Sequence, residues 1–91
     1  MKIEYADSFD KSTKKLKDKI AIKRLLSLVE KLEKATSLAE INNVVPIENY
    51  PFTYRIRTGD YRLIVEYVDG NITILLLKYL KRDDNTYREY N

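Results

Sequence analysis

The side chains able to carry chemistry in this sequence are arginines, lysines and tyrosines, because the chain contains neither His nor Cys. Toward the C-terminus they are concentrated in short segments: Tyr54–Arg57, Gly59–Arg62, Lys81–Arg82 and Tyr87. Without imidazole or thiol, the common proton shuttles and the usual zinc ligands are missing, so we expect no metal and no cofactor. Guanidinium groups keep a fixed charge and bind phosphate oxygens in pairs. The sequence therefore predicts a strongly anionic substrate, of which nucleic-acid phosphate is the plainest candidate.

Length and composition indicate one small globular domain that spans residues 1–91. Hydrophobic residues make up 44% of the chain and charged residues 34%, which argues against global disorder. The net charge of +3 permits nucleic-acid binding without requiring it, so the distribution of charge matters more than its total. No segment approaches the roughly 20 apolar residues of a membrane helix, and we expect a soluble cytoplasmic protein.

The N-terminal half has the periodicity of a short strand followed by two helices. Residues 2–6 alternate as a strand does, and Asp7 or Ser8 is the expected cap of the first helix. Core positions then recur at helical spacing, at Phe9, Thr13, Leu16 and Ile20, and again at Ile22, Leu25, Leu26, Val29 and Leu32. We expect two consecutive helices that meet near residues 18–20 and need a sheet to cover their apolar side.

The second half has the pattern of an antiparallel meander. The expected strands are 53–57, 61–68 and 71–80, with hairpin turns at Gly59–Asp60 and Asp69–Gly70 and a short additional strand at 44–45. The predicted fold is α+β: two N-terminal helices packed on a small, mainly antiparallel β-sheet in the order β-α-α-β-β-β, followed by a short C-terminal helix or tail.

Alternation along the middle strand separates a core face from a polar face. The core face consists of Leu63, Val65 and Tyr67. We expect these residues to pair with Leu76, Ile74 and Ile72, in that order. The opposite face, which we expect to be more open to solvent or a partner, is formed by Arg62, Ile64 and Glu66.

The arginines of the first two long strands share a face if the intervening turn has two residues. Arg55 and Arg57 then point the same way, and Arg57 lies directly opposite Arg62. Like charges directly opposite one another destabilise a sheet, so this pairing suggests an anion between them. Spacing alone leaves a second interpretation open, in which these arginines form an ordinary solvated face beside carboxylates.

The run from Tyr54 to Tyr67, followed by an apolar strand, Lys81–Arg82 and Tyr87, resembles the RelE/ParE superfamily of bacterial and archaeal toxins. The two expected helices also match the family, so the resemblance covers nearly the whole chain. Members of the RelE branch are endoribonucleases that cut mRNA in the ribosomal A site. The resemblance implies a cognate antitoxin that inhibits the toxin in a hetero-oligomeric complex, with mRNA and ribosomal RNA as further partners and no membrane.

Catalytic positions follow from the resemblance one residue at a time. Arg55 and Arg57 match two basic positions on the first long strand, and Arg62 matches the arginine of the next strand. Arg82 matches the arginine after the last strand, and Tyr87 the tyrosine of the C-terminal tail. The best-known RelE proteins have lysines at the first two of these positions, whereas this chain has arginines.

Such a site would drive a ribose 2′-hydroxyl onto the adjacent phosphorus, a step that needs a base, charge stabilisation and an acid. Arginines suit the stabilising role, but a guanidinium with a reference pKa of roughly 12.5–13.8 is a poor acid. Tyr87 is the candidate base, or a platform for an RNA base, and Lys81 is a source of the missing ammonium. Asp83 and Asp84 either support Arg82, act as base, or cap a C-terminal helix.

The first helix carries a cluster of lysines with two compatible interpretations. They bind ribosomal RNA or an acidic antitoxin segment, or they form the solvated face of an amphipathic helix. The expected RNA-binding residues are Lys11, Lys14, Lys15 and Lys17.

Two other functions remain as alternatives to the nuclease. A ParE-like toxin binds DNA gyrase and performs no RNA chemistry, although such toxins generally lack the full basic-plus-tyrosine set. A catalytically inert homologue would bind only its antitoxin, and the loss of both strand lysines is compatible with that interpretation.

Overall fold

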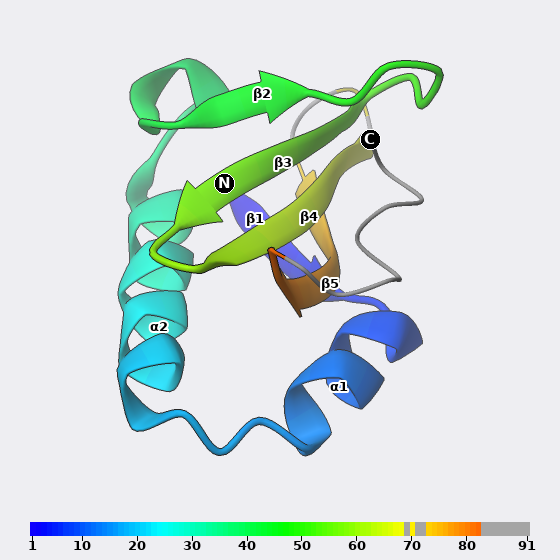
Figure 1. The fold of residues 1–91 in the computed structure, drawn as a ribbon. Coiled ribbons are helices and arrows are strands. Elements are labelled where there is room, and N and C mark those ends of the chain that lie inside the picture. The colour runs from blue at the N-terminus through cyan, green and yellow to red at the C-terminus, as the bar shows by residue number, and fades with distance from the viewer. Residues whose placement is uncertain (69, 71–72, 83–91) are drawn as a thin grey trace.

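The structure, a computed structural model, describes residues 1–68, 70 and 73–82, in which two helices pack on a five-stranded sheet (Figure 1). The elements in chain order are β1 (Lys2–Tyr5), α1 (Asp7–Lys14), α2 (Lys19–Lys34), the 3₁₀ turn η1 (Leu38–Glu40), β2 (Val44–Pro46), β3 (Thr53–Thr58), β4 (Tyr61–Val68) and β5 (Thr73–Lys81). The strand order is β1-β5-β4-β3-β2, with β1 parallel to β5 and the other pairs antiparallel. The predicted α+β fold is confirmed, while the expected C-terminal helix or tail lies outside the described residues.

The two helices begin in different ways. Before α2, the Asp18 carboxylate accepts hydrogen bonds from the backbone N–H groups of Ile20 (3.0 Å) and Ala21 (3.1 Å), as a side-chain cap does. Before α1, the cap position is the extended residue Ala6, which offers no side-chain acceptor, so the predicted cap at Asp7 or Ser8 is wrong. The Ser8 hydroxyl donates instead to the Leu77 carbonyl at 2.6 Å and attaches α1 to β5.

The core lies between the helices and the sheet, and it corrects two of the predicted helix positions. Ile20 and Leu26 are each 64% exposed. The helical period of α1 ends with that helix at Lys14 and does not continue to Ile20, and Leu26 lies outside the buried positions of α2. The buried stripe of α2 consists of Ala21, Leu25, Leu28, Val29 and Leu32. Leu63 and Val65 of β4 face this stripe with no exposed surface, which confirms the predicted core face of the middle strand.

The pairing of β4 with β5 differs from the predicted register. Val65 lies opposite Leu76 rather than Ile74, because Val68 pairs with Thr73 and residues 69–72 separate the two strands. The register then shifts at Leu77, which has no partner on β4, so that Ile64 lies opposite Lys78. This bulge reverses which side chains of β5 face the helices beyond Leu76.

The outer edge of β5 is covered by a strand over one half and by a helix over the other. β1 pairs with β5 through Leu76, and the Ala6 N–H donates to the Leu76 carbonyl at 2.9 Å where β1 ends. Farther along, Ser12 Oγ accepts from the Tyr79 N–H at 3.0 Å, in addition to the bond from Ser8 to Leu77. These bonds satisfy part of an otherwise open strand edge and hold α1 beside the second half of β5.

Candidate functional site

Three of the predicted catalytic arginines meet at the turn between β3 and β4, an arrangement that we call the arginine corner (Arg57, Arg62 and Arg82). Arg57 lies directly opposite Arg62 and Thr58 opposite Tyr61, so the turn has the two residues that the sequence predicts. The backbone N–H of Arg82 donates to the Asp60 carbonyl at 2.9 Å. Strand pairing and this bond therefore bring segments that are distant in sequence to one end of the sheet.

The two paired arginines have different surroundings. Arg62 is only 8% exposed, and its Nη1 donates to the carbonyl oxygens of Gly59 (3.1 Å) and Tyr61 (2.8 Å). Arg57 is exposed. Because carbonyl dipoles already compensate the Arg62 charge, the pairing is tolerated without an anion between the two side chains. Arg62 fixes the turn, and Arg57 is the side chain that a ligand can reach.

The face of the sheet turned away from the helices is less open than predicted. Ile64 has no exposed surface, and Glu66 is half-buried. The register places Ile64 between Arg55 on β3 and Lys78 on β5, so the aliphatic stems of two long side chains flank it. Arg55, itself half-buried, shares this face with the arginine corner.

The predicted supporting lysine and a lysine that the sequence analysis missed lie on different faces. Lys81 is opposite Tyr61, on the side of the sheet that carries Tyr79 and the helices. Lys78 is opposite Ile64 and thus shares a face with Arg55 and Arg62. Among the residues that the structure describes, Lys78 is the β5 lysine on the arginine face.

A groove of about 680 Å³ separates α1 from the second half of β5, and we call it the lysine groove. Its cations come from both elements: Lys11, Lys15, Lys78 and Lys81. No carboxylate of the described residues lines it. Lys11 of α1 and Lys15, the C-cap residue of that helix, both line the groove. The predicted RNA-binding residues Lys14 and Lys17 lie outside it.

Aromatic rings form one end of the lysine groove. Tyr61 stacks on Tyr79 with ring centroids 4.8 Å apart and planes 18° from parallel. The Tyr79 hydroxyl donates to the Ala21 carbonyl at 2.9 Å, and burial, with a smaller contribution from Tyr61, raises the pKa of Tyr79 to about 12. Tyr79 is therefore a structural phenol, and Tyr61 is the ring that the groove exposes.

The remaining predicted site residues, Asp83, Asp84 and Tyr87, lie outside the described residues. Within residues 1–68, 70 and 73–82, no three His, Cys, Asp or Glu side chains gather where they could hold a metal ion. No helix in the same part of the chain is long and apolar enough to cross a membrane.

Three residues near the site were given no role of their own from the sequence: Lys78, Tyr61 and Arg24, a residue of α2 beside the β3–β4 turn. Lys78 lies on the arginine face only because of the bulge at Leu77. No glycine or turn residue in that part of the sequence indicates a bulge. Arg24 contacts a turn far along the chain, a pairing that helical periodicity does not predict. Tyr61 directly follows the turn. Its position as an aromatic residue next to paired basic strand residues is a sequence feature that could have identified it as a candidate.

Comparison with known proteins identifies the family of the chain. Residues 3–85 match the family of the ParE toxin of the type II toxin-antitoxin system, parDE. The chain is 34% identical over 83 residues to Toxin RelE3 of Methanocaldococcus jannaschii, a match that covers 90% of this chain and 91% of the relative.

Solved structures with the same fold include toxins bound to antitoxins. The RelB-RelE antitoxin-toxin complex from Methanococcus jannaschii has a chain that aligns with a TM-score of 0.77 at 28% identity, covering 97% of this chain and 99% of that one. The archaeal RelE-RelB complex from Pyrococcus horikoshii OT3 aligns with a TM-score of 0.70 at 26% identity, covering 90% and 94%. The chain therefore belongs to the RelE/ParE family of toxins from type II toxin-antitoxin systems.

Proposed function

We propose that this protein is a ribosome-dependent endoribonuclease toxin that cleaves mRNA in the cytoplasm and is inhibited by a cognate antitoxin. The observation that carries the proposal is the arginine corner, where an exposed guanidinium, a turn-fixing guanidinium and Arg82 surround one two-residue turn. Such a cluster suits the phosphorane of a cleaved phosphodiester, because guanidinium groups keep their charge and fork onto phosphate oxygens.

The reaction needs no reagent beyond the RNA itself. The 2′-oxygen forms a bond to phosphorus, the bond from phosphorus to the 5′-oxygen breaks, and the products are a 2′,3′-cyclic phosphate and a 5′-hydroxyl. One proton leaves the 2′-hydroxyl for a base, for which we propose Tyr87, and one reaches the departing 5′-oxygen from an acid. Asp83 and Asp84 are proposed to support Arg82.

Positive charge for the departing oxygen has two candidate sources besides the arginines. Lys81 is the residue named from the sequence, but it lies on the Tyr61 side of the sheet. Lys78 lies on the arginine face and is the better placed ammonium. Loss of cleavage in Lys78→Ala, with cleavage retained in Lys81→Ala, would support this assignment, and the reverse result would contradict it.

The lysine groove is proposed to hold RNA beside the cleavage site. Its lysines provide a continuous cationic lining, and Tyr61 offers an aromatic face for stacking, the combination by which single strands are bound without sequence preference. Lys11 and Lys15 thereby keep the RNA-binding role predicted for the first helix. Lys14 and Lys17 are proposed to contact ribosomal RNA only from the outer surface of the α1 region.

The antitoxin complexes of the related structures support a cognate antitoxin as partner. We propose a hetero-oligomer in which the antitoxin neutralises the cationic surface and so prevents binding of RNA.

The test is expression of the protein in growing cells, followed by primer extension on a translated message. We expect codon-positioned cuts from the wild type, none from Arg82→Ala or Tyr87→Phe, and unchanged cuts from Lys2→Ala, which removes an exposed cation on β1. Absence of both cuts and toxicity in the wild type would instead favour an inert, antitoxin-binding homologue.

Gyrase inhibition is the second candidate, because the matching family is described by its ParE members. Growth arrest with intact messages and broken chromosomes in the same expression experiment would favour it over the nuclease.

A further inference from the structure

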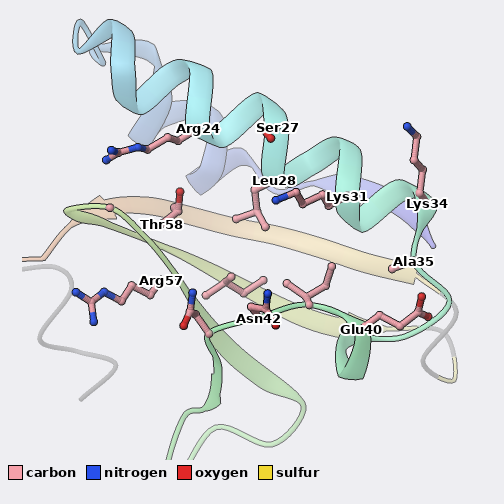
Figure 2. Close-up of a pocket in the computed structure, with 14 residues that line it drawn as sticks. Arg24, Ser27, Leu28, Lys31, Lys34, Ala35, Glu40, Asn42, Arg57 and Thr58 are labelled. Atoms are coloured by element: carbon pink, nitrogen blue, oxygen red, sulfur yellow. The ribbon is translucent and has the colours of Figure 1, made fainter.

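A second groove, of about 780 Å³, lies between α2 and the end of β3, on the helix side of the arginine corner (Figure 2). We propose that this α2–β3 groove is a phosphate-binding site that continues the RNA path away from the cleavage site, with Arg24 as its principal residue. The proposal rests on the proposed ribonuclease function and adds a contact surface to it.

The charge of the groove is strongly unbalanced. Arg24, Lys31 and Arg57 line it, and none of their charged groups forms a hydrogen bond or ion pair with another described residue. Lys34 also belongs to the lining but turns away in Figure 2 and pairs with Glu30 at 3.0 Å.

The one carboxylate in the lining, Glu40, is already occupied. It accepts hydrogen bonds from the Thr36 hydroxyl, the Thr36 N–H (2.7 Å) and the Ser37 N–H (3.2 Å). These bonds, the Thr36 hydroxyl first, lower the pKa of Glu40 and keep its carboxylate ionised at the end of the groove near η1. Glu40 therefore does not neutralise the guanidinium groups at the other end.

The Arg24 guanidinium lies against the β3–β4 turn. Gly59, at φ +63°, has no side chain, and a β-carbon there would stand 2.0 Å from Nη1 and 3.0 Å from Cζ of Arg24. The guanidinium therefore rests against the β3–β4 turn. This contact places the Arg24 charge at the end of β3 that carries Arg57.

The two arginines of the groove reach its same end from opposite walls, Arg24 from α2 and Arg57 from β3 (Figure 2). Arg57 also belongs to the arginine corner, so one polyanion can pass from the corner into the groove. Lys31 lies two turns beyond Arg24, roughly 10 Å along the helix axis, and Asn42 and Ser27 add neutral polar groups. Phosphates repeated along a chain fit such an elongated lining, and continuity with Arg57 favours RNA over an acidic peptide.

The test is binding of the full chain to a fluorescent single-stranded RNA with 2′-O-methyl riboses, which cannot be cleaved by 2′-hydroxyl attack. Fluorescence anisotropy is measured across a salt series for wild type, Arg24→Gln with Lys31→Gln, and a control with Lys19→Gln and Lys23→Gln. The control removes two exposed lysines of the same helix that do not line the groove. Both double variants lose the same formal charge.

We expect the groove variant to reduce the slope of log K against log salt by about 1.4, since each phosphate contact to a single strand contributes about 0.7. At 0.1 M salt this corresponds to roughly 25-fold weaker binding, against a small change in the control. Equal losses in the two variants would overturn the proposal, as would a groove variant that loses binding to poly-glutamate but not to RNA.

The outcomes separate this proposal from the nuclease. If the wild type cleaves messages but the groove variant binds RNA as the control does, only the groove assignment fails. If no messages are cut but the groove variant shows the selective loss, the RNA site stands and the nuclease fails.

Discussion

Arg57 and Arg62 occupy directly opposite positions of β3 and β4, yet only Arg57 leaves its guanidinium exposed, while Arg62 donates to the Gly59 and Tyr61 carbonyls. Two residues that alternation treats as equivalent thus have separate tasks. One holds the turn in shape, and the other presents charge to a ligand.

This division predicts a difference in stability between two alanine variants. Arg62→Ala should lower the free energy of unfolding by about 1–3 kcal/mol, because two partly buried carbonyl acceptors lose a charged donor. Arg57→Ala should change it by no more than about 0.5 kcal/mol. Urea unfolding followed by circular dichroism measures both, and equal losses in the two variants would contradict separate roles.

The Gly59 position predicts a second, coupled effect on stability. Gly59→Ala and Gly70→Ala both force alanine into a positive φ, at +63° and +64°, but only Gly59 has a neighbour, Arg24, within 4 Å. We expect about 1 kcal/mol of strain at both positions, and at Gly59 a small further loss because the flexible end of the Arg24 side chain must move aside.

A double-mutant cycle identifies the source of the additional loss at Gly59. Gly59→Ala combined with Arg24→Ala should recover the excess over Gly70→Ala, because the clashing guanidinium is gone. If the excess persists without Arg24, its cause is not the close approach of that side chain.

Tyr79 predicts an alkaline pH dependence of stability. Its pKa is raised from 10.0 to about 12, so the fold favours the neutral phenol. The stabilisation is complete below pH 10, and it is lost as the pH rises from about 10 to 12, because the unfolded chain then releases a proton that the folded chain keeps. The total is on the order of 2–3 kcal/mol. Unfolding of wild type and Tyr79→Phe at pH 8–12 measures it, and parallel pH profiles for the two proteins would refute it.

Tyr61 and Lys15 predict two separable contributions to RNA affinity in the lysine groove. Tyr61→Leu should weaken binding by about 1–3 kcal/mol per stacked base, with an unchanged salt dependence. Lys15→Gln should reduce the slope of log K against log salt by about 0.7, whereas Lys14→Gln, outside the groove, should change it less. Anisotropy with an uncleavable RNA measures both quantities, and identical slopes for the two lysine variants would argue against the groove.

The sequence predicted the parts of the fold that depend on local periodicity and turn chemistry. The Gly59–Asp60 turn has strong local preferences, and it fixed the pairing of Arg57 with Arg62 correctly. The helices and the core face of β4 followed from spacing of apolar residues. The predicted pairing of β4 with β5 was wrong for two reasons. Asp69–Gly70 has the sequence of a two-residue turn, but four residues lie between the paired Val68 and Thr73, and the bulge at Leu77 has no distinctive local pattern.

The candidate site, too, was predicted where it depends on local sequence and not where it depends on tertiary packing. Resemblance and alternation identified Arg55, Arg57, Arg62 and Arg82, and the structure describes where all of them lie. The contact between Arg24 and Gly59 joins a helix to a distant turn, and the position of Lys78 depends on the bulge. Both features arise from tertiary packing, which the pattern of neighbouring residues in the sequence does not predict.

The additional residue at Leu77 also matters for any comparison of this chain with its relatives. Before this residue, β5 pairs with β1. From Leu77 onward, β5 is bonded to α1 and lines the lysine groove. In a relative that lacks this residue, the later side chains of the strand would point to the opposite face of the sheet, even where the amino acids are identical. Homologous positions after Leu76 should therefore be assigned by superposition, with a gap where needed, before a lysine or arginine there is credited with a shared role.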